Sequence, residues 1–336
     1  MGKYLGKENK RERPTLPRFY PSAHKATACQ ITPLQFPKEN PSYMNGTACA
    51  NVATVRLLRL TASLALALLR AHAAIPVPTE FPFEFREGLL WIKATIPNSS
   101  EPLNLLLDTG AGVSVINDAT AERLRLNFGL PVTVHGVGTI LTGHWLKPFS
   151  ATVNDVALPV NFLAVDLERL SKSCAQPVDG LLGADFFRGR VVQIDFDALK
   201  VRILPRQQPS LADTTPLQLR PCGMRVQVRV NQRKAQWVRL DTGCASALQW
   251  VSSDVRSQDC MRKPAIGLTE LSIPQTETTV QLGPTRFYSV PTGIHPQPIF
   301  QGEAGLLGNG LLSRFSSITI DAKTGHLILQ SRPVRP

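Results

Sequence analysis

A repeated motif constrains the fold of this 336-residue chain more than any other feature. The triplet Asp-Thr-Gly occurs at Asp108 and again at Asp241, each time directly after an apolar segment. Two segments upstream of each triplet are apolar or alternate between apolar and polar residues, and turn-forming residues bound them, which is the pattern of β-strands. These expected strands are Leu89–Ile96, Leu103–Leu107, Met224–Val230 and Ala235–Leu240.

The same companions follow both triplets. Gly-Leu-Leu-Gly occurs at residues 180–183 and 305–308, which is 72 and 64 residues after the respective aspartates. A short helix candidate comes next in each half, and then two strands joined by a hairpin turn. These strands are expected at Val191–Asp195, Lys200–Leu204, Ile318–Asp321 and His326–Leu329. The repetition predicts an all-β chain of two pseudo-symmetric, closed, β-barrel-like lobes with one short helix per lobe.

The repeat also divides the chain. We expect an N-terminal lobe at residues 82–205, a linker at 206–216, where Pro and Gln are frequent, and a C-terminal lobe at 217–330. Because both copies of the motif lie in one chain, a site shared by the two lobes would need no second subunit. We therefore expect a monomer.

Residues 52–73 have the pattern of a secretory signal. Arg56 and Arg59 precede the apolar run Leu60–Leu69, and small residues follow at Ala71 and Ala73. The run is shorter than the roughly 20 residues that span a bilayer. We therefore expect the folded part to be exported, to a periplasm or out of the cell, with a membrane anchor as the alternative. Residues 1–51 are expected to be a disordered or misannotated extension, since a start at Met44 would give a signal of ordinary length.

The net charge does not indicate a nucleic-acid partner. Of the formal charge of +12, the first 73 residues carry eleven Lys or Arg against three Glu, which leaves only +4 for the rest. Histidine and cysteine residues are scattered, so we expect no metal and no cofactor. Four cysteines remain after the signal, and an exported chain could pair them in three ways. They are Cys174, Cys222, Cys244 and Cys260.

Two Asp-Thr-Gly triplets, each followed by an apolar-apolar-Gly element, resemble the aspartic protease superfamily. Each half is similar to one retropepsin subunit, the bacterial type in particular around Val178–Phe187, and the whole is similar to the bilobal pepsin arrangement. The resemblance covers roughly residues 82–330. It implies an acid protease fold and an aspartic endopeptidase that acts on a polypeptide substrate.

The resemblance also implies roles for individual residues. Asp108 and Asp241 would be the catalytic pair, one carboxylate activating a water and one carboxylic acid binding the scissile carbonyl. Two carboxyls held a few Å apart share one proton, because both cannot ionise cheaply. The residues that would support the pair within its loops are Thr109, Gly110, Thr242 and Gly243. Those that would thread behind the loops are Leu181, Leu182, Gly183, Leu306, Leu307 and Gly308.

Members of this superfamily close the cleft with a glycine-tipped hairpin flap. The candidate here is Val132–Thr142, with Gly136, Val137 and Gly138 at its tip, although a plain surface hairpin would have the same pattern. No Tyr lies in this stretch. The equivalent segment of the second half is expected near Thr276–Gly283, with a weaker pattern.

Four further acidic residues have structural interpretations. Asp179 and Asp185 flank the first Gly-Leu-Leu-Gly without acidic counterparts in the second, and we expect them to pair with Arg188 or Arg190 or to cap the helix. Asp195 and Asp321 end strands before hairpins, where aspartate favours turns.

Cys244 is the main departure from the family pattern, because the residue after Asp-Thr-Gly is usually Ser, Thr or Ala, as Ala111 is. It is interpreted as a buried thiol or as half of a disulfide with Cys222 or Cys260, and a redox-sensitive site is the further alternative. A catalytically inactive binding or inhibitory protein of the same fold is the rival function. Both triplets are intact, which favours the enzyme.

Overall fold

The structure, a computed structural model, describes residues 79–332 except residues 98, 138, 175, 206–213, 253–260 and 266–270. All of them belong to one compact unit of the chain. The expected extension and signal at residues 1–73, most of the expected linker, Gly138 and Cys260 lie outside the described residues. Among the residues described, no helix is long and apolar enough to cross a membrane.

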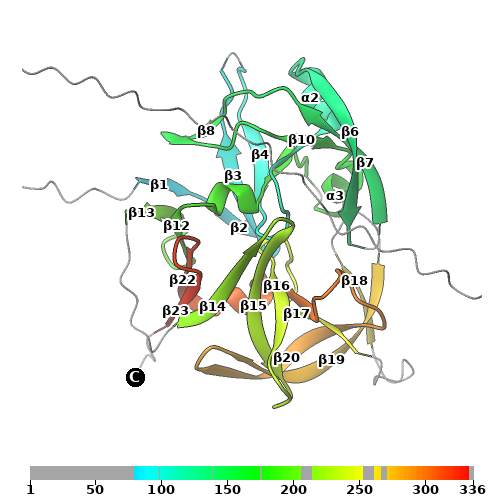
Figure 1. The fold of residues 1–336 in the computed structure, drawn as a ribbon, viewed down its shortest axis with the longest axis vertical. Coiled ribbons are helices and arrows are strands. Elements are labelled where there is room, and N and C mark those ends of the chain that lie inside the picture. The colour runs from blue at the N-terminus through cyan, green and yellow to red at the C-terminus, as the bar shows by residue number, and fades with distance from the viewer. Residues whose placement is uncertain are drawn as a thin grey trace, which may run out of the picture. The chain divides into compact units, whose positions relative to one another are not determined.

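The first half builds an eight-stranded sheet, at the top of Figure 1, in the order β2-β3-β4-β11-β5-β10-β7-β6. Its strands are β2 (Glu84–Arg86), β3 (Leu89–Ala94), β4 (Leu103–Leu107), β5 (Val115–Asn117), β6 (Phe128–Gly136), β7 (Thr139–Leu146), β10 (Leu163–Val165) and β11 (Gly180–Leu182). The pairing of β4 with β11 is parallel and sets Leu106 beside Leu181. The Gly-Leu-Leu-Gly segment therefore lies along the strand that leads into the first triplet.

The second half repeats this pairing order in the run β15-β16-β21-β17-β20-β19-β18. Its strands are β15 (Gly223–Val230), β16 (Gln236–Leu240), β17 (Leu248–Val251), β18 (Met261–Ala265), β19 (Leu271–Leu282), β20 (Thr285–His295) and β21 (Gly305–Leu307). Here β16 and β21 are parallel, with Leu240 beside Leu307. Each aspartate-bearing strand thus has the same neighbour in both halves.

A third group of strands, at the left of Figure 1, joins the halves in the order β1-β13-β12-β22-β23-β14 and continues the sheet of the second half through β15. These strands are β1 (Thr79–Pro82), β12 (Val191–Asp195), β13 (Lys200–Leu204), β14 (Thr214–Arg220), β22 (Phe315–Asp321) and β23 (His326–Ser331). The first-half strand β12 pairs antiparallel with the second-half strand β22, so that Ile194 lies opposite Ile318. One apolar core runs through both halves, and both of these isoleucines are fully buried in it.

The remaining elements are short. The segment after each Gly-Leu-Leu-Gly is helical, as predicted: η1 (Ala184–Phe187) is a 3-10 helix and α4 (Asn309–Leu312) an α-helix. The first half has two further helices that the sequence analysis did not predict, α2 (Asp118–Arg123) and α3 (Glu168–Ser173), and a small pair of strands, β8 (Thr152–Val153) and β9 (Val156–Ala157). The chain is mostly β, as expected. Closure of the lobes into barrels stays a prediction, because the eight-stranded sheet ends in β2 and β6.

Candidate active site

Asp108 and Asp241 meet at the boundary between the two halves. Each follows the end of its strand, β4 or β16, and their carboxyl groups are hydrogen-bonded to each other. The backbone N–H of Asp108 donates to the carbonyl of Leu182, and that of Asp241 donates to Leu307, at 2.9 Å in both cases. The strands carrying Gly-Leu-Leu-Gly therefore hold the two aspartates from behind.

The adjacent threonines tie the two loops together. The N–H of Thr109 donates to the Oγ1 of Thr242, and the N–H of Thr242 donates to the Oγ1 of Thr109, both at 3.0 Å. Each hydroxyl in turn donates across the boundary, from Thr109 to the carbonyl of Leu240 at 2.8 Å and from Thr242 to that of Leu107 at 2.7 Å. Both threonines are fully buried. These are the reciprocal bonds that the resemblance implies.

The glycines of the triplets leave room for the opposite carboxyl group. A Cβ atom on Gly110 would lie 2.5 Å from the carboxyl carbon of Asp241, and one on Gly243 would lie 2.5 Å from that of Asp108. Their N–H groups also donate to the aspartate of their own triplet at 2.9 Å. Only glycine permits this close approach of backbone to carboxylate.

The environments of the two carboxyls are unequal. Burial raises the pKa of both, and the charge of Asp108 raises that of Asp241 well above its ordinary value. Asp108 accepts N–H bonds from Gly110 and Ala111, at 2.9 and 3.1 Å, and these bonds oppose the rise in its pKa. The arrangement therefore favours one shared proton that resides on Asp241, with Asp108 ionised.

Arg239 is a residue at this site that the sequence analysis missed. It is buried, two residues before Asp241, and its Nη1 donates to the carbonyl of Gly110 in the first half at 2.9 Å. Its guanidinium also forms a two-pronged ion pair with the buried Glu303, at 2.8 and 3.0 Å. The signal available in the sequence was a cation at a position where the first copy of the repeat has Leu106.

The four acidic residues outside the pair are structural. Asp195 and Asp321 each accept two backbone N–H groups of the turn that follows, as expected of turn formers. The partners expected for Asp179 were wrong, whereas Asp185 does interact electrostatically with the expected Arg190. Asp179 binds Thr120 and Arg123 of α2 at 2.8 and 2.9 Å, and Asp185 binds the hydroxyl and N–H of Ser114. Helix α2, which was not predicted, brings these partners to Asp179.

Cys244 is a free thiol, so the structure contains no disulfide between it and Cys222. Burial, with the nearby charge of Asp241, raises the pKa of the Cys244 thiol to about 12. A thiol with so high a pKa is almost entirely protonated at neutral pH, so it is a poor nucleophile and a poor redox sensor. Cys174 is also a free and buried thiol. Of the interpretations offered for Cys244, the thiol is the one that the structure supports.

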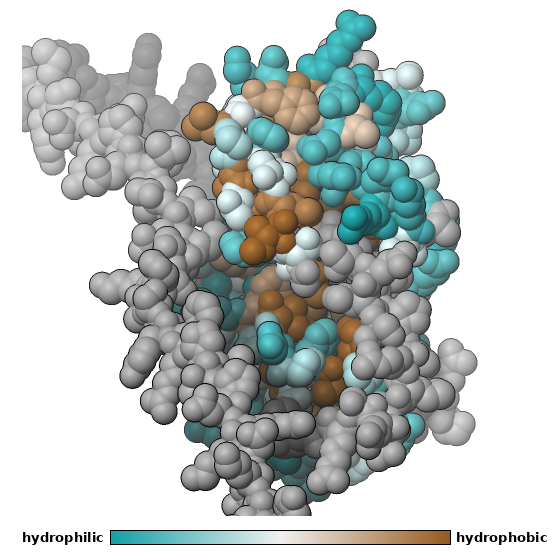
Figure 2. All heavy atoms as spheres, turned by 90° about the vertical axis from the view of Figure 1, so that its right-hand side faces the viewer, coloured by the Kyte–Doolittle hydropathy of each residue, from teal (hydrophilic) through white to brown (hydrophobic). Residues whose placement is uncertain are grey.

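The segment proposed as a flap is a hairpin of β6 and β7, with Gly136 opposite Thr139 beside the tip. Its inner side chains Val132, Val134 and Leu141 pack on a smaller apolar cluster of the first half, separate from the main core. Leu130 and Ile140 are exposed. Figure 2 views the molecule from the right-hand side of Figure 1, where β6 and β7 lie, and shows apolar residues in the middle of this face with hydrophilic ones beside them.

The second-half counterpart of this hairpin was placed wrongly. Residues Thr276–Gly283 belong to β19 and its turn into β20. In the pairing order, β18 and β19 take the places of β6 and β7. The error arose because β19 and β20 are long, so the strand pattern runs on well past the counterpart hairpin.

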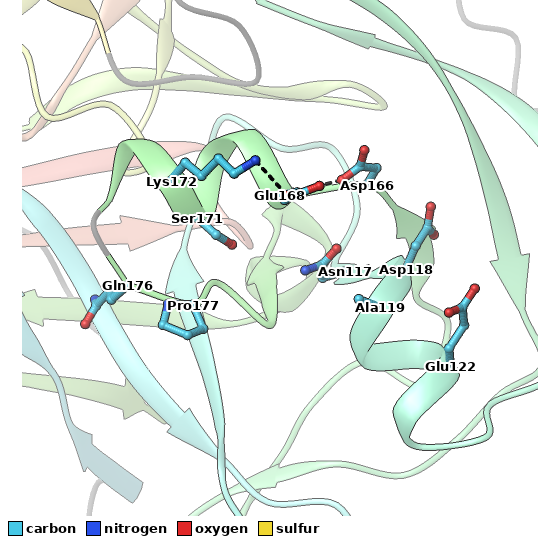
Figure 3. A pocket seen from close by; sticks show the side chains of 10 residues that line it. All are labelled: Asn117, Asp118, Ala119, Glu122, Asp166, Glu168, Ser171, Lys172, Gln176 and Pro177. Carbon is cyan, nitrogen blue, oxygen red and sulfur yellow. Dashed lines mark hydrogen bonds and ion pairs between the residues drawn. The ribbon is translucent and has the colours of Figure 1, made fainter.

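A hollow of about 620 Å³ lies between α2 and α3, away from the carboxyl pair (Figure 3). Asp118, Glu122, Asp166 and Glu168 line it, and Lys172 pairs with Glu168 at 2.7 Å. Burial raises the pKa of Asp118. Within the described part of the chain, no cluster of His, Cys, Asp or Glu is arranged to hold a metal ion.

Comparisons with known proteins bear on the family and on the fold. Residues 92–186, which include Asp108 and the first Gly-Leu-Leu-Gly, match a family model described as aspartyl protease, whereas Asp241 lies outside the match. No curated protein has a significant sequence match. The crystal structure of an aspartic proteinase from Irpex lacteus is similar in fold, with a TM-score of 0.51 and 11% identity over 76% of this chain and 97% of that one. The first half of the chain thus resembles aspartyl proteases in sequence, and the chain has the fold of an aspartic proteinase.

Proposed function

We propose that the chain is an aspartic endopeptidase in which Asp108 and Asp241 act together on a water molecule. The hydrogen-bonded carboxyl pair between two equivalent loops carries this proposal. Two adjacent carboxyls that share one proton provide a base and an acid at the same place, as hydrolysis of a peptide bond requires.

The unequal environments of the two carboxyls support different starting roles for them. Asp108 is ionised and accepts hydrogen bonds from two N–H groups. It takes a proton from the water while the water oxygen attacks the scissile carbonyl carbon. Asp241 donates its proton to the carbonyl oxygen, so that a neutral tetrahedral diol forms. The proton held by Asp108 then passes to the amide nitrogen, the C–N bond breaks, and Asp241 recovers a proton from the diol. The products are a carboxylic acid and an amine, and the pair returns to its first state.

The substrate we propose is an extended polypeptide segment that lies between the carboxyl pair and the hairpin of β6 and β7. The inner face of this hairpin is apolar, through Val132, Val134 and Leu141. We propose that the tip at Gly136, Val137 and Gly138 closes over the bound segment as a flap. Closure would exclude water other than the one that reacts.

Other expectations from the sequence remain proposals. We propose that the chain is exported by the segment at residues 52–73, with attachment to a membrane as the alternative outcome, and that it acts as a monomer. The support for export is the apolar run after Arg56 and Arg59. Size-exclusion chromatography with light scattering tests the monomer, and sequencing of the mature N-terminus tests cleavage of the signal.

The activity itself is tested with an unfolded protein substrate. The purified chain, incubated with it from about pH 3 to about pH 7, is expected to release peptides that mass spectrometry identifies, and pepstatin-like compounds are expected to inhibit the release. Asp166→Asn, which changes a carboxyl in the hollow between α2 and α3, is the matched control and should cleave normally. A wild-type chain that releases no peptide in this range would instead favour a binding protein.

A further inference from the structure

We propose that Arg239 is a positioning residue of this site, which fixes the first aspartate loop through the carbonyl of Gly110 and favours the ionised form of the carboxyl pair. This inference rests on the proposed function, because it concerns the pH range over which the pair is in its working state. It adds a residue that lies outside both Asp-Thr-Gly triplets.

The contacts of Arg239 span the two halves of the chain. From β16 its Nη1 reaches two carbonyl oxygens, those of Gly110 in the first loop and Cys222 in the turn between β14 and β15, both at 2.9 Å. Its guanidinium lies over the ring of Phe300, with 3.5 Å from Cζ to the ring centroid. A planar guanidinium can satisfy several fixed acceptors at once, which a lysine cannot do. Arg239 therefore links the first loop to the second half by a connection separate from the threonine bonds.

The ion pair leaves positive charge beside the carboxyls. Glu303 is almost fully buried and is shared by two arginines, since Arg225 Nε also contacts it at 2.8 Å. Two guanidinium groups against one carboxylate carry a net charge of one. Arg239 is the more buried of the two, with a side-chain exposure of 6% against 22% for Arg225. Its charge is therefore screened less by water.

Among the residues that the structure describes, Cys244 is the other ionisable group that interacts with the pair, and its thiol stays neutral because its pKa is raised to about 12. The charge of Arg239 lowers the pKa of both Asp108 and Asp241 against the effect of burial. The equivalent position in the first half is Leu106, which has no charge. At this pair of equivalent positions, the second half thus has a cation where the first half has an uncharged side chain.

The test measures the ionisation of the carboxyls directly and not only through activity. Aspartate side-chain carboxyls are labelled with ¹³C, their signals are assigned with Asp108→Asn and Asp241→Asn, and the pair is titrated by NMR. Arg239→Met should shift this titration up by about one pH unit, the size expected when a close opposite charge is removed. Glu303→Gln should shift it in the other direction, because the cluster then gains net positive charge. Arg239→Lys keeps the charge and should stay nearer to wild type.

Arg225→Met is the matched control, since it removes one positive charge from the same Glu303 but leaves the bond from Arg239 to Gly110. Its shift should be smaller than that of Arg239→Met. Equal shifts in these two variants, or an unchanged titration in Arg239→Met, would overturn the proposal. If Arg239→Met does not fold, Glu303→Gln becomes the deciding variant, and an unchanged titration of the carboxyl pair in it would overturn the proposal. A wild-type chain without proteolytic activity would contradict the proposed function, while the titration would still decide the role of Arg239.

Discussion

Thr109 and Thr242 donate the same hydrogen bond to each other, from backbone N–H to side-chain hydroxyl, at 3.0 Å in both directions. The two residues are separated by 133 positions in the sequence and come from different halves of the chain. Both are fully buried, so no water can replace a lost partner. The relative position of the two aspartates therefore depends on this exchange.

Replacing either threonine with valine is expected to destabilise the fold. Thr109→Val leaves the N–H of Thr242 and the carbonyl of Leu240 without their buried partner, at a cost of about 1–3 kcal/mol in free energy of unfolding. Urea unfolding followed by tryptophan fluorescence measures it. Thr133→Val, on the exposed side of β6, is the control and should change the stability little. Equal stability of Thr109→Val and wild type would show that the reciprocal threonine hydrogen bonds do not contribute to the free energy of unfolding.

The close approach of Gly110 to Asp241 predicts a large effect of one methyl group. In Gly110→Ala the new Cβ would lie 2.5 Å from the carboxyl carbon of Asp241 and must displace it. We expect the cleavage rate to fall about 100-fold, as for a misplacement of roughly 1 Å at a reacting group. Gly189→Asn places a side chain where nothing lies within 4 Å, at a positive φ that asparagine tolerates, and should cleave normally. Undiminished cleavage by Gly110→Ala would contradict the geometry of the pair.

The raised pKa of Asp241 predicts how stability changes with pH. A carboxyl whose pKa is higher in the folded than in the unfolded state favours folding at low pH, and this contribution is lost as the pH rises through the folded value. The loss begins above the ordinary value of 3.8. Asp241→Asn should therefore become more stable relative to wild type as the pH rises above about 4, by roughly 1.4 kcal/mol for each unit of the pKa shift. A difference in stability that does not vary with pH would mean that the carboxyl is not perturbed.

The raised pKa of Cys244 predicts a chemically inert thiol. With a value of about 12, almost none of it is thiolate at neutral pH, so iodoacetamide should modify it far more slowly than free cysteine. Mass spectrometry of timed samples measures the rate, and the same chain in urea is the control. Rapid modification of Cys244 in the folded chain would contradict the raised pKa of its thiol. Cys244→Ala should retain cleavage activity, because it makes the second loop match Ala111 of the first.

The sequence predicted what depends on local pattern. The strands before the triplets and the helical turns after Gly-Leu-Leu-Gly were found where the alternation and paired apolar residues indicated them. Arg239 could not be predicted in this way, since a cation on a strand ordinarily faces solvent, and its partner Glu303 is 64 residues away. Asp179 was assigned the wrong partners for a similar reason, because Arg123 is 56 residues away and belongs to an unpredicted helix. Charged pairs between distant segments follow from the fold and leave no local signal.

The most direct test of the account is the rate at which Asp108→Asn and Asp241→Asn cleave an unfolded protein. Both variants should keep the fold, as measured by circular dichroism, because asparagine matches aspartate in shape. Each variant alone should lose cleavage, since neither carboxyl can supply both the base and the acid. Full activity in either folded variant would contradict the claim that the two aspartates work as a pair.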